Sequence, residues 1–100
     1  MIEGEGSHVV LPLEGALDVA TATEAQKRML GLELRRGDRL VLDLSQLTFM
    51  DSTGIRFILQ ARTHAQLHGA SFVLVRGPEP VMRVLELVGL EPQLDLVSSL

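Results

Sequence analysis

The tetrapeptide Asp51-Ser52-Thr53-Gly54 has the clearest chemical potential in this sequence. It stands between an apolar stretch and a helix-like stretch, so Ser52 or Asp51 can cap the helix by accepting a hydrogen bond from a free backbone N–H. A hydroxyl at a helix start also stays near the surface, where a kinase can reach it. A phosphate there would meet free N–H groups and the positive end of the helix dipole. We therefore expect Ser52 to be a helix cap or a phosphoacceptor.

Phosphorylation of Ser52 would change the charge of this segment without breaking the fold. It would add about −1.5 to −2 charges beside Asp51, and a docked acidic or apolar partner surface would then be repelled. Arg56 follows Ser52 by four residues and can meet the phosphate on the same helix face; its alternative role is that of an ordinary exposed arginine. Gly54 lets the first helical turn pack closely against its neighbour.

Other patterns that carry chemistry are missing or incomplete. The chain has no cysteine, no P-loop, no G-x-G-x-x-G and no G-x-S-x-G around a serine. His64 and His68 have the i, i+4 spacing that can bind a metal, but no glutamate lies between them, and we expect two solvated histidines near a helix end. The sequence therefore predicts a protein that is not an enzyme and has no cofactor or metal.

Composition and charge exclude further classes of protein, namely nucleic-acid binders and membrane-spanning proteins. Nine basic and thirteen acidic residues give a formal net charge of −4, and no tryptophan or tyrosine is present; nucleic-acid binders show a basic patch and often stacking aromatics. Arg35, Arg36 and Arg39 cluster around Asp38, and we expect them at a helix end, where cations suit the dipole. No stretch approaches the roughly 18 apolar residues of a membrane span. With its acidic start, the chain is expected to be cytoplasmic, with no nucleic-acid or membrane partner.

The elements that position this segment alternate between strand and helix. The 100 residues predict one domain over 1–100, with residues 1–7 frayed or forming an edge strand. The first helix is expected to begin at a capping box of Thr21 and Glu24 and to end at Gly37. We expect strands over 8–13, 39–44, 71–75 and 94–97, and a turn or short strand over 14–18. A second helix is expected over 55–68, closed by Gly69. A third helix is expected to begin at Gly77–Pro80 and to stop at a Schellman motif at Gly89–Leu90.

Two of these strands have distinct expected places in the sheet. Pro12 removes a donor from the hydrogen-bond ladder, so strand 8–13 should lie near an edge or carry a bulge. The apolar run over 39–44 is typical of a central strand buried on both faces. The alternation predicts an α/β domain with one small mixed, partly parallel sheet and helices packed on it.

Three stretches of the sequence resemble the STAS domain family, in particular bacterial anti-sigma factor antagonists. Residues 42–55 contain Asp51-Ser52-Thr53-Gly54 and are similar to the family signature. Residues 13–18 (LEGALD) resemble its first G-x-L-D turn, and residues 81–90 resemble its third helix and stop. The resemblance covers nearly the whole chain in the right order. It implies a STAS-like fold and a binding module.

The resemblance also implies a mechanism. In antagonists of this kind, the unphosphorylated domain binds an anti-sigma factor that is also an ATP-dependent serine kinase, and sigma factor is released. The kinase then phosphorylates the serine that corresponds to Ser52, the complex dissociates, and a serine phosphatase restores the domain. Asp51 would position Ser52, Asp18 would lie near the partner surface, and Thr53 would be a weaker acceptor. The expected partner-binding residues are Asp18, Asp51, Ser52, Thr53, Gly54 and Arg56.

The chain departs from the family pattern at both ends, and other functions stay open. Only a glycine-containing stub precedes strand 8–13, and the sequence stops at Leu100, where the family often has a further amphipathic helix. An exposed sheet edge or face would favour a homodimer.

The alternative function is a constitutive STAS adaptor subunit of a larger signalling or lipid-transport assembly, with Ser52 only a helix cap. A small-ligand or nucleotide sensor is the third hypothesis.

Overall fold

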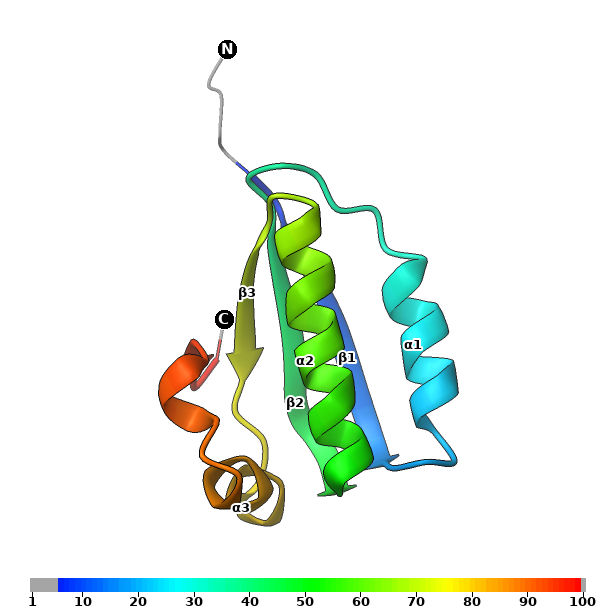
Figure 1. The fold of residues 1–100 in the computed structure, drawn as a ribbon, viewed down its shortest axis with the longest axis vertical. Helices are drawn as coiled ribbons and strands as arrows, with labels where there is room; N and C mark the ends of the chain where they lie inside the picture. Colours follow the sequence, from blue (N-terminus) through cyan, green and yellow to red (C-terminus); the bar gives the residue numbers. More distant parts are fainter. Residues whose placement is uncertain (1–5, 100) are drawn as a thin grey trace.

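Strands and helices alternate along the chain in the computed structural model, which describes residues 6–99 (Figure 1). The edge strand considered for residues 1–7 falls mostly on residues 1–5, which lie outside the described part; Gly6 and Ser7 are not in a strand. The elements are β1 (His8–Leu17), α1 (Ala22–Leu30), β2 (Arg39–Met50), α2 (Ser52–Leu67), β3 (Ser71–Val75), α3 (Glu79–Leu87), a 3₁₀ turn (Glu91–Gln93) and β4 (Leu96–Val97).

The four strands form one sheet in the order β1-β2-β3-β4, and each neighbouring pair is parallel. The α/β class is confirmed, whereas the expected mixed character is not found: the sheet of residues 6–99 is wholly parallel. β1 lies at an edge and its register against β2 shifts between Pro12 and Glu14, as the missing proline donor predicts. β2 lies centrally, and Leu40, Val41 and Leu42 are fully buried, so both faces of this strand are covered.

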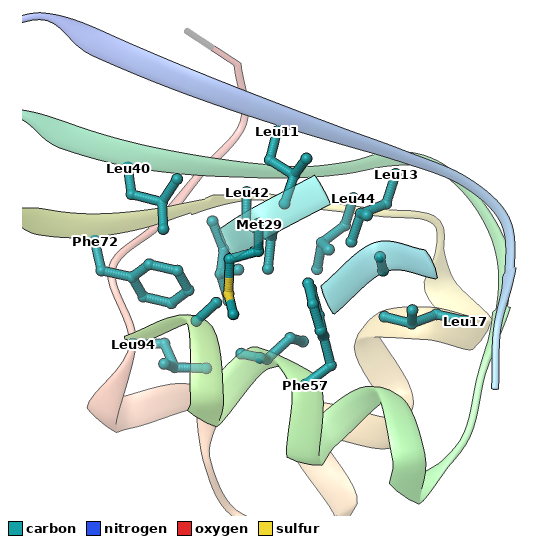
Figure 2. Close-up of a cluster of buried hydrophobic side chains, with 14 of the residues drawn as sticks. Leu11, Leu13, Leu17, Met29, Leu40, Leu42, Leu44, Phe57, Phe72 and Leu94 are labelled. Atoms are coloured by element: carbon teal, nitrogen blue, oxygen red, sulfur yellow. The ribbon is translucent and has the colours of Figure 1, made fainter. Parts of the chain in front are cut away.

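The core lies between the sheet and the helices. α1 and α2 run side by side along one face, and α3 lies near the carboxyl ends of the strands (Figure 1). Figure 2 shows leucines of β1 and β2 pointing toward Met29 of α1 and Phe57 of α2. Phe57, the only phenylalanine of α2, is 2% exposed. These buried contacts hold α2, and with it Ser52, at a fixed place on the sheet.

The first helix is shorter than its sequence pattern predicts. α1 ends at Leu30, with Gly31 as its C-cap, and not at Gly37. The helix gives way to a loop that places Leu34 in the core, where this side chain is 7% exposed. Gly37 instead occupies a turn at φ 89°, and its N–H donates to the Gly69 carbonyl. The expected place of the arginine cluster is therefore wrong: Arg35 and Arg36 lie in this loop and Arg39 begins β2.

The predicted capping box at the start of α1 is also wrong. Thr21 is the N-cap residue, but its side chain makes no capping hydrogen bond. Its hydroxyl oxygen instead accepts from the Asp18 N–H over 3.0 Å, and its O–H donates to the Ala16 carbonyl over 2.7 Å, so the tight turn after β1 uses the group that would cap the helix. The predicted Schellman stop of α3 is confirmed: the Gly89 N–H donates to Glu86 and the Leu90 N–H donates to Leu85.

Asp38 ties the start of the sheet together. Its Oδ1 accepts from the Ser7 N–H over 3.0 Å, and its Oδ2 accepts from the Arg35 N–H over 2.9 Å. These two backbone hydrogen bonds, with the Arg35 charge, lower the pKa of Asp38 against the opposing effect of burial. The carboxylate thus holds the chain before β1 against the loop before β2.

We expect Asp38 to make the stability of the domain fall as the pH is lowered into the acid range. Its contribution is fully present above the ordinary aspartate pKa of 3.8 and is lost as the pH falls through the lower value of the folded protein. Asp38→Asn should lower the melting temperature at neutral pH and flatten its fall at acid pH, measured by circular dichroism. Asp95→Asn is the control for removing an exposed carboxylate. An unchanged acid profile in Asp38→Asn would contradict this role.

Candidate functional site

The candidate site lies where β1 and β2 end and α2 begins. Parallel strands end at the same edge of a sheet, so the turns after β1 and β2 become neighbours. The Asp51 N–H donates to the Leu17 carbonyl over 3.4 Å, and Leu17 is paired with Met50 in the sheet. The structure thus brings the segments that begin at Asp18 and Asp51 to the same end of the domain.

Asp51, not Ser52, caps α2. Asp51 has an extended backbone, and its Oδ1 accepts a hydrogen bond from the Thr53 N–H over 2.9 Å. Ser52 is the exposed first residue of the helix, and within residues 6–99 no hydrogen bond to its hydroxyl is found. The hypothesis that Ser52 serves as the cap is therefore wrong. Ser52 is thus an exposed residue whose hydroxyl takes no part in the capping hydrogen bond.

Gly54 allows the first turn of α2 to sit directly on the strand ends. A Cβ atom at this position would lie 2.2 Å from Cγ of Met50 and 3.2 Å from Cδ2 of Leu17, and the first distance is far inside van der Waals contact. The close packing expected of Gly54 is confirmed. Thr53, the second hydroxyl of the segment, is only half-exposed, which makes it less accessible than Ser52.

Asp18 organises the turn between β1 and α1. Its Oδ1 accepts from the N–H groups of Ala20 and Thr21 over 3.0 and 3.3 Å. This hydrogen bonding is the usual way in which an aspartate shapes a turn. The carboxylate remains partly exposed at the end of the domain where Asp51 lies. Its structural role is thus visible, and its contact with a partner stays a prediction.

Arg56 lies one helical turn beyond Ser52 and is exposed. Its side chain borders a small depression between the starts of α1 and α2, together with Thr23 and Thr53. Within residues 6–99 no ion pair or side-chain hydrogen bond joins Arg56 to another residue. The structure therefore places a cation beside the phosphoacceptor candidate, on the side that faces α1.

Two exposed apolar residues at this end were not foreseen. Phe49 is 50% exposed and Val19 is 79% exposed. Leu47 and Phe49 are two residues apart and would share a face in a regular strand. β2 carries an extra residue between them relative to β1, since Gly15 pairs with Leu47 but Ala16 pairs with Phe49. Leu47 therefore stays buried and Phe49 turns outward, which no spacing rule indicates.

The STAS domain model matches residues 1–100. The chain belongs to the STAS domain family. It is 23% identical over 94 residues to the anti-sigma-B factor antagonists of Listeria monocytogenes and Listeria innocua, which covers 94% of this chain and 82% of each relative. Its fold is similar to that of the anti-sigma factor antagonist SpoIIAA in its unphosphorylated form. The TM-score is 0.71 at 19% identity, covering 98% of this chain and 85% of SpoIIAA.

His64 and His68 of this STAS domain, both in or next to the last turn of α2, differ in their surroundings. Their rings lie 4.5 Å apart, and Nδ1–H of the exposed His68 donates to the His64 carbonyl. His64 is half-buried and its Nε2 has no hydrogen-bond partner, so the prediction of two solvated histidines is wrong for this residue. Burial, and then the nearby His68, lower the pKa of His64.

Residues 6–99 of the STAS domain contain neither a metal-binding cluster nor a membrane-spanning helix. No group of three or more His, Asp or Glu side chains is placed to hold a metal ion. None of the helices in this range has the length and apolar character that crossing a membrane requires.

The capping role of Asp51 can be separated from its charge. Asp51→Ala should lower the free energy of unfolding by about 1 kcal/mol, because the Thr53 N–H loses its acceptor. Asp51→Asn keeps an oxygen at the same place and should stay within about 0.5 kcal/mol of the wild type. Urea denaturation measures both. Equal losses in the two variants would show that the carboxylate acts through its charge and not as a cap.

Proposed function

We propose that this STAS domain is an anti-sigma factor antagonist that is switched off by phosphorylation of Ser52. The observation that carries the proposal is the exposed Ser52 hydroxyl at the first position of α2, left free because Asp51 caps the helix. The proposal also draws support from the relatives, which are anti-sigma factor antagonists by name.

The unphosphorylated domain binds an anti-sigma factor that has serine kinase activity, and sigma factor is released. Phe49 and Val19 supply the apolar part of the contact, and Asp18 and Asp51 flank it. Apolar side chains that are this exposed gain most when a partner covers them. All the steps take place in the cytoplasm, where ATP is available to the kinase.

The switch is a phosphoryl transfer. The γ-phosphoryl group of ATP moves to Oγ of Ser52, the hydroxyl proton leaves, and ADP is released. The new dianion is tolerated by the fold because it stands at the positive end of the α2 dipole. It also stands beside Asp51 and the apolar contact, so the bound partner is repelled. A serine phosphatase hydrolyses the ester, which restores the hydroxyl and releases inorganic phosphate.

The proposal predicts that Ser52 is the phosphoacceptor. Purified histidine-kinase-like ATPases from the source genome, given ATP, should modify the wild type at Ser52 and leave Ser52→Ala unmodified, as read by mass spectrometry. Ser45→Ala, which changes an exposed serine of β2, is the matched control. Ser52→Glu should weaken binding of the same kinase about tenfold or more, with a melting temperature within about 2 °C of the wild type.

Three outcomes would contradict the proposed phosphorylation switch at Ser52. Phosphate on another residue would remove Ser52 from the mechanism. Full binding by Ser52→Glu would remove the switch. Stable binding to a subunit of a larger assembly without any phosphoryl transfer would favour the constitutive adaptor instead.

Phe49 and Val19 should contribute to the same contact. Phe49→Ser and Val19→Ser should each weaken kinase binding by about fivefold or more, because they remove apolar area that the partner covers. Both side chains are already exposed, so thermal stability should change little. Leu87→Ser removes from α3 a side chain that is as exposed as Val19, and it serves as the control. Titration calorimetry measures the affinities, and unchanged values for both variants would place the contact elsewhere.

A further inference from the structure

A shallow groove runs between α1 and α2, away from the end that carries Ser52. It has a volume of about 440 Å³, and its lining combines Met and Leu side chains with polar ones. Two of its leucines are strongly exposed: Leu30 of α1 by 60% and Leu67 of α2 by 79%. We call this surface the α1–α2 groove and define it by Met29, Leu30, Arg56, Leu59, Thr63 and Leu67.

Arg56 connects the α1–α2 groove with the candidate site. Its side chain borders the groove and also the smaller depression that contains Thr53. The Gln26 amide donates to Gln60 over 3.4 Å and bridges the two helices beside it. Arg56 has no ion-pair or hydrogen-bond partner within residues 6–99. Its guanidinium can therefore bind an anion in the α1–α2 groove or in the smaller depression.

The charge and spacing of the groove indicate what fits it. Arg56 is the one permanently charged side chain of the lining; the others are apolar, amide, hydroxyl or histidine groups. Arg56, Gln60, Thr63 and Leu67 follow one another at spacings of four, three and four, so they form one stripe along α2 with its charge at one end and its leucine at the other. An amphipathic helix with a carboxylate over Arg56 is complementary to this surface in shape and charge.

We propose that the α1–α2 groove binds an amphipathic helix of the anti-sigma factor and that Arg56 couples this contact to Ser52. This inference rests on the function proposed above. With Ser52 unmodified, Arg56 pairs with a carboxylate of the bound helix. Phosphoserine at position 52 stands one turn away and takes the guanidinium as an i, i+4 partner. The carboxylate of the bound helix then loses its partner beside a new dianion, which weakens the complex.

The coupling can be tested on the domain alone. Phosphoserine is incorporated at position 52, and its ³¹P signal is titrated. Arg56→Gln should raise the second pKa of the phosphate, because the nearby cation that favours the dianion is gone. Arg56→Lys should retain most of the effect. Arg62→Gln removes a cation farther along α2 and should leave the titration unchanged. A titration that is the same in wild type and Arg56→Gln would overturn the coupling.

The docking surface is tested with the kinase that phosphorylates Ser52 in the experiment above. Leu67→Asp should weaken its binding about tenfold or more. Leu87→Asp, at the same 79% exposure on α3, should remain within about twofold of the wild type. Arg56→Gln should weaken binding of the unphosphorylated domain and should reduce the further loss caused by Ser52→Glu, because both changes act through one contact.

The outcomes separate this inference from the proposed function. If the kinase modifies Ser52 but binds Leu67→Asp and Arg56→Gln as tightly as the wild type, the groove contact is wrong and the switch stands. If no kinase modifies Ser52, the proposed function itself fails. Sedimentation that shows a wild-type dimer, and a monomer for Leu67→Asp, would assign the groove to a second copy of this chain and would overturn the partner helix.

Discussion

The parallel pairing of β1 with β2 is the constraint on which the rest of the site depends. It brings the turn after β1 beside the start of α2, so that Asp51 donates to Leu17 across the strand ends. The two register shifts in this pair decide which side chains of β2 reach the core and which reach solvent. Gly54 then lets α2 rest on Met50 and Leu17 without a side chain in between. Changes in this pairing would move every residue of the candidate site together.

The start of α2 divides two roles between adjacent residues. Asp51 satisfies a free N–H of the first turn, and this leaves Ser52 with the most exposed hydroxyl of the segment. A serine that served as the cap would have its oxygen engaged, and its modification would cost the helix a hydrogen bond. The observed arrangement leaves the Ser52 hydroxyl outside the hydrogen bond that stabilises the helix start. That separation is what a switch needs if it is to change binding and leave the fold intact.

The exposed apolar residues lie in two places that α2 connects. Phe49 and Val19 lie near its first turn, whereas Leu30 and Leu67 lie near its last. Arg56 stands between the two places, on the face toward α1. A single helix therefore carries the proposed phosphoacceptor, a cation one turn away and one wall of a groove. Its buried face, with Phe57 and Ile58 in the core, keeps these groups in a constant geometry.

The sequence by itself determined the alternation of elements, the central place of β2, the edge position of the strand with Pro12 and the presence of a capping residue for α2 within Asp51-Ser52. These features follow from local rules: apolar runs, proline chemistry and capping residues act within a few positions of one another. Only the tertiary structure decided that α1 stops at Leu30, that Phe49 turns outward and that Arg56 borders a groove. Those outcomes depend on pairing register and on packing between segments far apart in the chain, and no local spacing encodes them.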